Sequence, residues 1–85
     1  MTKRDKLLAK LADKNGRYSL SFEELQTLGR AHGFVITNRD GSHYVFRHPD
    51  LVQNVCLVKL HGKDVEVKRP YIRELAEAFE ELGLI

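Results

Sequence analysis

The sequence predicts an α+β fold in which helices cover one face of a three-stranded antiparallel sheet. Apolar residues recur at helical spacing in 20–33 and 70–83, with a shorter stripe near the N-terminus. Between them, in 34–60, β-branched and aromatic residues form three short runs separated by polar turns. The expected order is therefore helix, helix, three strands, helix.

The first expected helix lies within "TKRDKLLAKLADKNG", residues 2–16. Leu7, Leu8 and Leu11 fall on one side of it, and Gly16 can end it as a left-handed cap. This apolar stripe is thin, so the helix can dock on the core or bind a partner, and docking is the preferred prediction. We assign 1–18 as a helical extension of a core at 19–84, within one domain spanning 1–85.

The second expected helix has a strong start signal. Ser21 and Glu24 have the S-x-x-E spacing of a capping box, and Leu20 and Leu25 can form a hydrophobic staple across it. These signals predict a helix from about Phe22 to His32.

The sequence also predicts where this helix ends and which of its sides is buried. Gly33 is the expected stop, and the helix dipole favours a charged His32 near the C-terminal end. We interpret His32 as a helix-end residue rather than a catalyst. The expected buried stripe consists of Phe22, Leu25 and Leu28.

Three strands are expected next. "FVIT" and "HYVF" are joined by "NRDG", whose Asp-Gly pair is typical of a tight hairpin turn, and "NVCLVKL" supplies the third strand. Cys56 is interpreted as a small buried residue of that strand.

The last helix is expected to begin with Pro70 at its first position and to end at Gly83. With the second helix it should cover one face of the sheet, leaving the other face open to solvent or a partner. Its apolar face consists of Ile72, Leu75, Ala76, Phe79 and Leu82.

Length and composition limit the function classes. A chain of 85 residues, 42% hydrophobic, has room for one modest core and no deep two-domain cleft. No apolar run approaches the roughly 18–20 residues of a membrane span, and the N-terminus lacks the apolar core of a signal peptide, so we expect a cytoplasmic protein with no membrane association. One cysteine and four histidines without CxxC or HExxH spacing predict neither a metal site nor a cofactor.

The charges are unevenly distributed although the net charge is only +2. Residues 1–18 carry +4, residues 36–73 carry +3, and residues 74–85 carry −4. This separation favours a basic surface that binds a polyanion. Solvated helix faces without a ligand explain the same charges.

Strand alternation separates the side chains of the second strand. His43, Val45 and Arg47 should share one face, while Tyr44 and Phe46 should face the helices. Histidine is suited to general-base chemistry because its ordinary pKa is about 6.5. Arg47 beside it would bind phosphate.

The stretch "GSHYVFRHP", residues 41–49, carries a family resemblance in this context. Together with "FEELQTLGRAHGF" before it and "KRPYIRELAEAFEELGL" after it, it resembles the HicA family of bacterial toxins. The resemblance covers about residues 19–84. It implies an α-β-β-β-α core similar to a double-stranded-RNA-binding domain, here with an extra N-terminal helix.

The same resemblance implies a function. HicA proteins are endoribonucleases (mRNA interferases) of toxin-antitoxin modules, which act in stress responses, and the match puts the catalytic base at His43. It also implies a HicB-like antitoxin covering the His43 face, with DNA bound only through that antitoxin. Taken with the basic residues, it predicts an mRNA contact surface consisting of Arg39, Gly41, Ser42, Arg47, Lys68 and Arg69.

The alternatives remain open at this point. His43 can be an ordinary hairpin residue; His48, before Pro49, fits a structural strand-end role better than a catalytic one, and His61 fits a turn. Phosphate and plain solvent suit four basic residues equally: Lys59, Lys63, Lys68 and Arg69. The rival function is a non-catalytic RNA-binding or partner-binding module of the same fold, and the sequence names no general acid.

Overall fold

A computed structural model describes residues 2–13, 15–60 and 66–85 of the chain. The sheet is antiparallel with the order β1-β2-β3, and the α+β order predicted from the sequence is confirmed. The helices are α1 (Lys3–Ala12), α2 (Phe22–Ala31) and α3 (Arg69–Glu81), and the strands are β1 (Val35–Asp40), β2 (His43–Arg47) and β3 (Val55–Val58).

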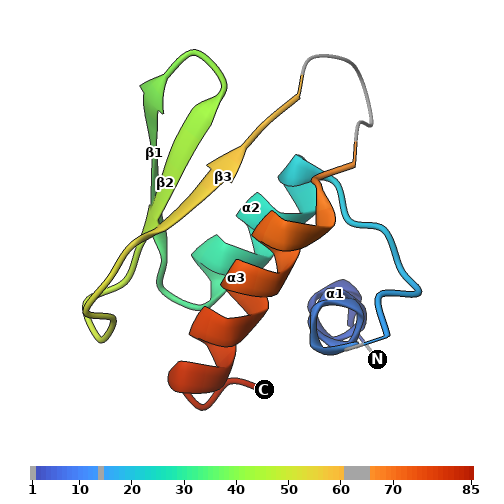
Figure 1. Ribbon diagram of the computed structural model, residues 1–85. Helices are drawn as coiled ribbons and strands as arrows, with labels where there is room; N and C mark the ends of the chain where they lie inside the picture. The colour runs from blue at the N-terminus through green and yellow to red at the C-terminus, as the bar shows by residue number, and fades with distance from the viewer. Residues whose placement is uncertain (1, 14, 61–65) are drawn as a thin grey trace.

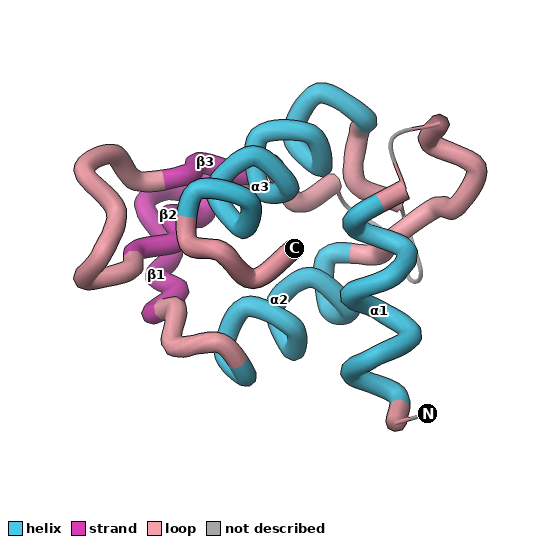
Figure 2. The backbone as a smooth tube through the Cα atoms, turned by 90° about the horizontal axis from the view of Figure 1, so that it is seen from below, coloured by secondary structure: helices cyan, strands magenta, loops and turns pink. Residues whose placement is uncertain are grey.

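The elements form three layers (Figure 1). Helices α2 and α3 lie against one face of the sheet, and Figure 2 shows them between the sheet and α1. The opposite face of the sheet has no described element on it. The predicted open face is therefore present in the part of the chain that the structure describes.

Local capping explains where α1 and α2 begin. Thr2 and Asp5 form a capping box at α1, and Ser21 and Glu24 form the predicted one at α2. The predicted end of α1 is wrong, because the helix stops at Ala12 with an extended residue after it. Gly16 does have a positive φ of 65°, but it bends the connection to α2 rather than closing α1.

The C-terminal ends of α2 and α3 share one mechanism. The Phe34 N–H donates to the Gly29 carbonyl at 2.9 Å, and the Leu84 N–H donates to the Phe79 carbonyl at 2.9 Å. In each case the intervening glycine has a positive φ, as the Schellman motif requires. Both predicted stops are thus confirmed.

At its N-terminal end, α3 begins one residue earlier than the sequence predicts. Lys68 is the N-cap and Arg69 the first helical residue, so Pro70 occupies the second position. Ala78 is buried on this helix, whereas the expected Ala76 and Leu82 are only partly buried.

The core is built around Phe46 of β2, which is fully buried. Gly29 of α2 allows the close approach, since a Cβ at that position would lie 3.2 Å from the Phe46 ring. The core is completed by Leu20, Leu25, Leu28, Leu57, Ile72, Leu75 and Phe79, among others. This packing fixes β2 against α2 and so sets the orientation of the whole sheet.

Helix α1 docks on the core, as the preferred prediction had it. Leu7 and Leu11 are each only 3% exposed and belong to the same core cluster as the leucines of α2 and α3. Burying two leucines is worth roughly 3–6 kcal/mol in transfer free energy. Among the described helices, none has the length and apolar character that a membrane span demands.

Candidate functional site

The hairpin between β1 and β2 turns at Gly41 and Ser42, between the paired residues Asp40 and His43. The turn is one residue later than the expected "NRDG", because β1 continues to Asp40. A bulge between Asn38 and Asp40 takes Arg39 out of the regular pairing. Gly41 has a φ of +43°, which is why a glycine suits this position.

Two further contacts hold the turn in place. The Asn38 side-chain amide donates to the Gly41 carbonyl at 3.0 Å and to the His43 carbonyl at 3.3 Å. From the other side, the Lys59 N–H donates to the Ser42 carbonyl at 2.8 Å. The turn is thereby anchored to both neighbouring strands, and His43 begins β2 from a fixed backbone.

The predicted alternation along β2 is confirmed. Phe46 is buried and Tyr44 packs on the core, whereas His43 and Arg47 are exposed. The register pairs His43 with Val58 on β3. These side chains belong to the open face, which consists of Val35, Thr37, Val45, Cys56 and Val58 with His43 and Arg47 at its two ends.

His43 is paired with an acidic residue that the sequence analysis did not single out. Its Nδ1 lies 3.0 Å from Oδ1 of Asp40, the residue directly opposite in the hairpin register. Because a carboxylate only accepts, Nδ1–H is the donor and Nε2 carries the lone pair of the neutral ring. The His43 side chain is 51% exposed, and the Asp40 contact leaves Nε2 unused.

Arg47 and Arg39 lie on either side of this pair along the chain. Arg47 lies four positions after His43, roughly 13 Å along β2. Arg47 therefore does not form the clamp directly beside His43 that the sequence suggested. Arg39, exposed at the bulge, is two residues from the turn.

His48 has a structural environment. Its Nε2–H donates to the His32 carbonyl at 3.1 Å, while its Nδ1 accepts the Asp50 N–H at 3.1 Å. The ring also lies edge-on to Phe34, with centroids 5.0 Å apart. Both ring nitrogens are thus occupied by backbone groups, which agrees with the strand-end role expected for His48.

His32 differs from its expectation. Its ring packs edge-on against Phe79 at 5.5 Å, and its Nε2 is buried with no hydrogen-bond partner in the described part of the chain. Burial, with a smaller contribution from the charge of Arg4, lowers the pKa of His32. The charged form expected from the helix dipole is therefore disfavoured. We call the cluster of His32, Phe34, His48 and Phe79 the histidine junction.

The predicted basic contacts before α3 lie elsewhere. The Arg69 guanidinium donates to the Tyr18 carbonyl at 3.5 Å and packs over Gly16, on the α1 side of the helix layer. Lys68 precedes it as the N-cap. The fold therefore separates these two residues from the His43 hairpin. His61 and Lys63 lie outside the described residues.

The centre of the open face is apolar. Val35 is 60% exposed, and Val45 and Cys56, which are paired in register, are both half-buried. Cys56 therefore does not lie in the core as expected but contributes to this face. An apolar strip with a histidine at one end and an arginine at the other is suited to contact with another molecule.

No three His, Cys, Asp or Glu side chains of the described residues lie close enough together to hold a metal ion. Comparisons of the chain with protein-family models, curated proteins and solved structures gave no match. The functional argument consequently rests on the residues themselves and on the geometry of the His43 hairpin.

Proposed function

We propose that the protein is an endoribonuclease toxin that cleaves mRNA without a metal ion, using His43 as the general base. The observation that carries the proposal is the His43–Asp40 pair, which leaves Nε2 unused at one end of an open sheet face. The resemblance of residues 41–49 to the HicA family supports the same assignment.

The chemistry follows from where the lone pair lies. Nε2 of His43 takes the proton of an RNA 2′-hydroxyl, and the 2′-oxygen attacks the adjacent phosphorus. The bond from phosphorus to the 5′-oxygen breaks, and that oxygen takes a proton from water reaching the exposed site. The products are a 2′,3′-cyclic phosphate and a free 5′-hydroxyl.

The surrounding residues have supporting roles in this proposal. Gly41 and Ser42 let the RNA backbone approach the turn closely, because Gly41 has no side chain and nothing lies within 4 Å of where its Cβ would be. Arg39 and Arg47 bind flanking phosphates and are exposed for that purpose.

A cleavage assay tests the proposal. Purified protein should cut a single-stranded transcript in the presence of a chelator, and His43→Ala should lower the rate by about 10²–10⁴-fold, the usual contribution of a general base. The parent should arrest growth on expression and the variant should not. Equal cleavage and equal arrest by both proteins would overturn the proposal, and loss of activity with chelator would favour a metal mechanism.

A matched control is available directly after the same strand. His48→Ala removes a histidine whose two nitrogens contact only backbone groups in the described structure. Its cleavage rate per folded molecule should stay within a few-fold of the parent. A loss as large as that of His43→Ala would contradict the assignment of His43 as the single base.

The apolar centre of the open face favours a partner-binding role as well. In the proposal, a HicB-like antitoxin covers Val35, Val45 and the His43 end of this face and so blocks cleavage in the cytoplasm, and any DNA binding comes through that antitoxin. Adjacent coding of a small protein that co-purifies with this chain is the expected finding.

The partner contact can be tested on the sheet itself. Val35→Glu puts a charge at an exposed position, so it should weaken the complex without altering the folding of the free chain. If the chain instead binds RNA or a partner and never cleaves RNA, it is a non-catalytic module of the same fold.

A further inference from the structure

A second charged surface lies on the α1 side of the molecule, away from the His43 hairpin. A groove of about 410 Å³ separates the α1–α2 connection from the start of α3. Its charged and aromatic lining consists of three basic residues, one exposed aromatic ring and one acid. These residues are Arg17, Lys68, Arg69, Tyr18 and Glu66. We call it the Tyr18 groove.

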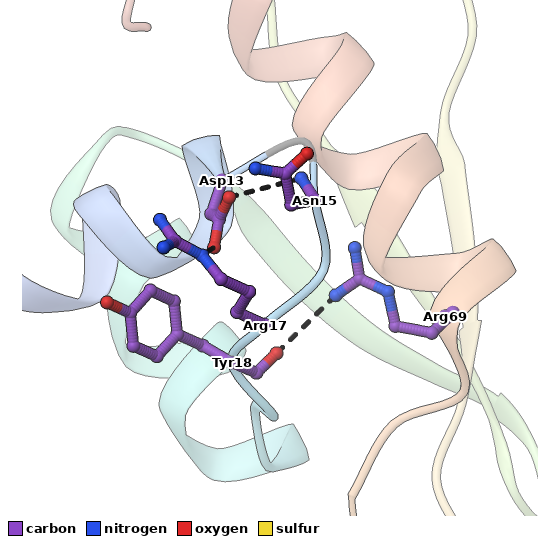
Figure 3. A network of polar contacts seen from close by, with 5 residues as sticks. All are labelled: Asp13, Asn15, Arg17, Tyr18 and Arg69. Atoms are coloured by element: carbon purple, nitrogen blue, oxygen red, sulfur yellow. Dashed lines mark hydrogen bonds and ion pairs between the residues drawn. The ribbon is translucent and has the colours of Figure 1, made fainter.

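Polar contacts fix the shape of this groove (Figure 3). Arg17 Nε donates to Asp13 at 3.1 Å, and the Asn15 N–H donates to the same carboxylate at 3.1 Å. Burial raises the pKa of Asp13, but the bonds from Asn15 and Arg17 more than offset it, so the pKa lies below its usual value. Asp13 therefore stays ionised and holds Arg17 in position.

Arg17 and Tyr18 together form a stacking surface. The guanidinium carbon of Arg17 lies 5.8 Å from the centroid of the Tyr18 ring, and Tyr18 is 45% exposed. Planar guanidinium and phenol groups are the side chains on which unpaired RNA bases stack. An exposed tyrosine beside two further cations is difficult to explain by stability alone.

Arg69 adds a donor directed at the same place. It lies against Gly16, where a Cβ would come within 2.9 Å of its guanidinium, and it uses one of five N–H donors on the Tyr18 carbonyl. The remaining donors suit a phosphate group next to a base stacked on Tyr18.

Basic residues connect the two surfaces around the end of the molecule where α2 and α3 begin. Lys59 is bonded to the Ser42 turn through its N–H, and its ammonium lies 5.4 Å from the Phe22 ring at the start of α2. Lys68 follows Val67, whose N–H donates to the Leu20 carbonyl at 2.9 Å. Lys59 therefore lies between the His43 turn and the start of α2, and Lys68 lines the Tyr18 groove itself.

We propose that the Tyr18 groove binds a distal part of the same single-stranded RNA that is cleaved at His43, with a base on Tyr18 and a phosphate on Arg69. This inference rests on the proposed function for its substrate class. The molecule is 32 Å in its longest dimension, and stacked nucleotides rise about 3.4 Å each, so a strand of roughly ten nucleotides spans it. The groove consequently selects long single strands over short ones.

Strand length gives a direct test. Binding is measured by fluorescence anisotropy in a His43→Ala background, with unstructured RNA of about five and about fifteen nucleotides. Tyr18→Ala should weaken binding of the longer strand about tenfold and leave the shorter one unchanged, whereas Tyr18→Phe should bind like the parent. Equal effects at both lengths, or none, would overturn the inference.

The salt dependence tests the phosphate contact. Arg69→Gln should lower the slope of log K against log salt by about 0.7 for the longer strand, while Arg69→Lys should keep the slope. Arg30→Gln, which removes the same charge at the other end of α2, is the control and should change the slope less. An unchanged slope for Arg69→Gln would contradict a phosphate contact there.

Three further outcomes separate this inference from its rivals. Displacement of RNA by polyglutamate of the same charge, as effectively as by RNA itself, would favour an acidic protein segment as the occupant and overturn the RNA assignment. If the parent never cleaves RNA but Tyr18→Ala still weakens binding of long strands, the proposed activity fails and the groove assignment stands. If the parent cleaves and the groove variants behave like the parent, the groove assignment fails alone.

Discussion

His43 is the first residue of β2. His48, five positions further along the chain, directly follows the last residue of that strand. His43 is half exposed, and its ring is hydrogen-bonded through Nδ1 to the carboxylate of Asp40. His48 contacts backbone groups with both nitrogens and packs against Phe34. Two histidines five residues apart therefore differ in their surroundings rather than in residue type, and only His43 has a ring placed for the proton transfer that we propose.

The same comparison extends to the two regions around these residues. The hairpin carries polar contacts near solvent, where each contributes little to the free energy of unfolding. The histidine junction is a ladder of rings in which Phe34 stacks on Phe79 at 5.3 Å, between His48 and His32. Substitutions should therefore change activity in the first region and stability in the second.

The largest expected effect comes from His43. His43→Ala should lower the cleavage rate by about 10²–10⁴-fold while changing the free energy of unfolding by less than about 0.5 kcal/mol, because the side chain is half exposed. Cleavage kinetics and urea denaturation on the same preparations give both numbers. A variant that unfolds easily would assign His43 to the fold instead.

His48→Ala should have the opposite pattern. It leaves the His32 carbonyl and the Asp50 N–H without their partner and opens space beside Phe34, so it should cost about 1–3 kcal/mol of stability. Urea denaturation measures this loss. An unchanged midpoint would show that the histidine junction contributes nothing to folding.

Asp40→Asn should have a smaller effect on activity. The amide can no longer fix the Nδ1–H tautomer as a carboxylate does, but Asp40 is 71% exposed, so we expect a rate lower by about tenfold rather than the roughly 10⁴-fold loss at a buried triad aspartate. Asp40→Glu should recover part of the rate. Equal cleavage rates for parent and Asp40→Asn would remove Asp40 from the mechanism.

The smallest effect concerns His32 and pH. Because burial, chiefly, and the charge of Arg4 lower its pKa in the folded protein, the unfolded chain binds more protons below about pH 6.5. Its contribution to stability is greatest above that pH and is lost as the pH falls through it. Burial raises the pKa of Asp13, but the bonds from Asn15 and Arg17 lower it further, so that the pKa lies below its usual value. The resulting change in stability falls near pH 4 and below, outside the range in which His32 acts.

Chemical denaturation at several pH values between about 5 and 7.5 isolates the His32 effect. His32→Leu should be less sensitive to pH than the parent across this range. An equal slope in both proteins would mean that other groups cause the acid sensitivity.

Much of the fold could be predicted from the sequence because its signals are local. Capping boxes, stop glycines and period-two alternation depend on neighbours within a few residues, and the strand and helix order followed from them. The end of α1 and the first residue of α3 were missed because each depends on the backbone conformation of one residue: Asp13 is already extended, and Lys68 is the N-cap of α3. Ala78 was missed because alanine carries a weak periodic signal.

The candidate site was only half predictable. His43 and its face followed from alternation, but the Asp40 contact depends on the hairpin register, which places residues three apart directly opposite each other. The length of the turn is the signal that encodes this contact, since a two-residue turn at Gly41 and Ser42 pairs Asp40 with His43. The position of Arg69 and the buried Nε2 of His32 depend on how α1 and α3 pack, and no local pattern encodes that.

The end group of the cleaved RNA tests the central claim most directly. With His43 as the base for a 2′-hydroxyl, mass spectrometry of the upstream fragment should find a 2′,3′-cyclic phosphate, and a single 2′-deoxy nucleotide at the cut should abolish cleavage. The same fragment should be absent with His43→Ala. Products with a 3′-hydroxyl, or cutting of the 2′-deoxy substrate at the parent rate, would contradict the account.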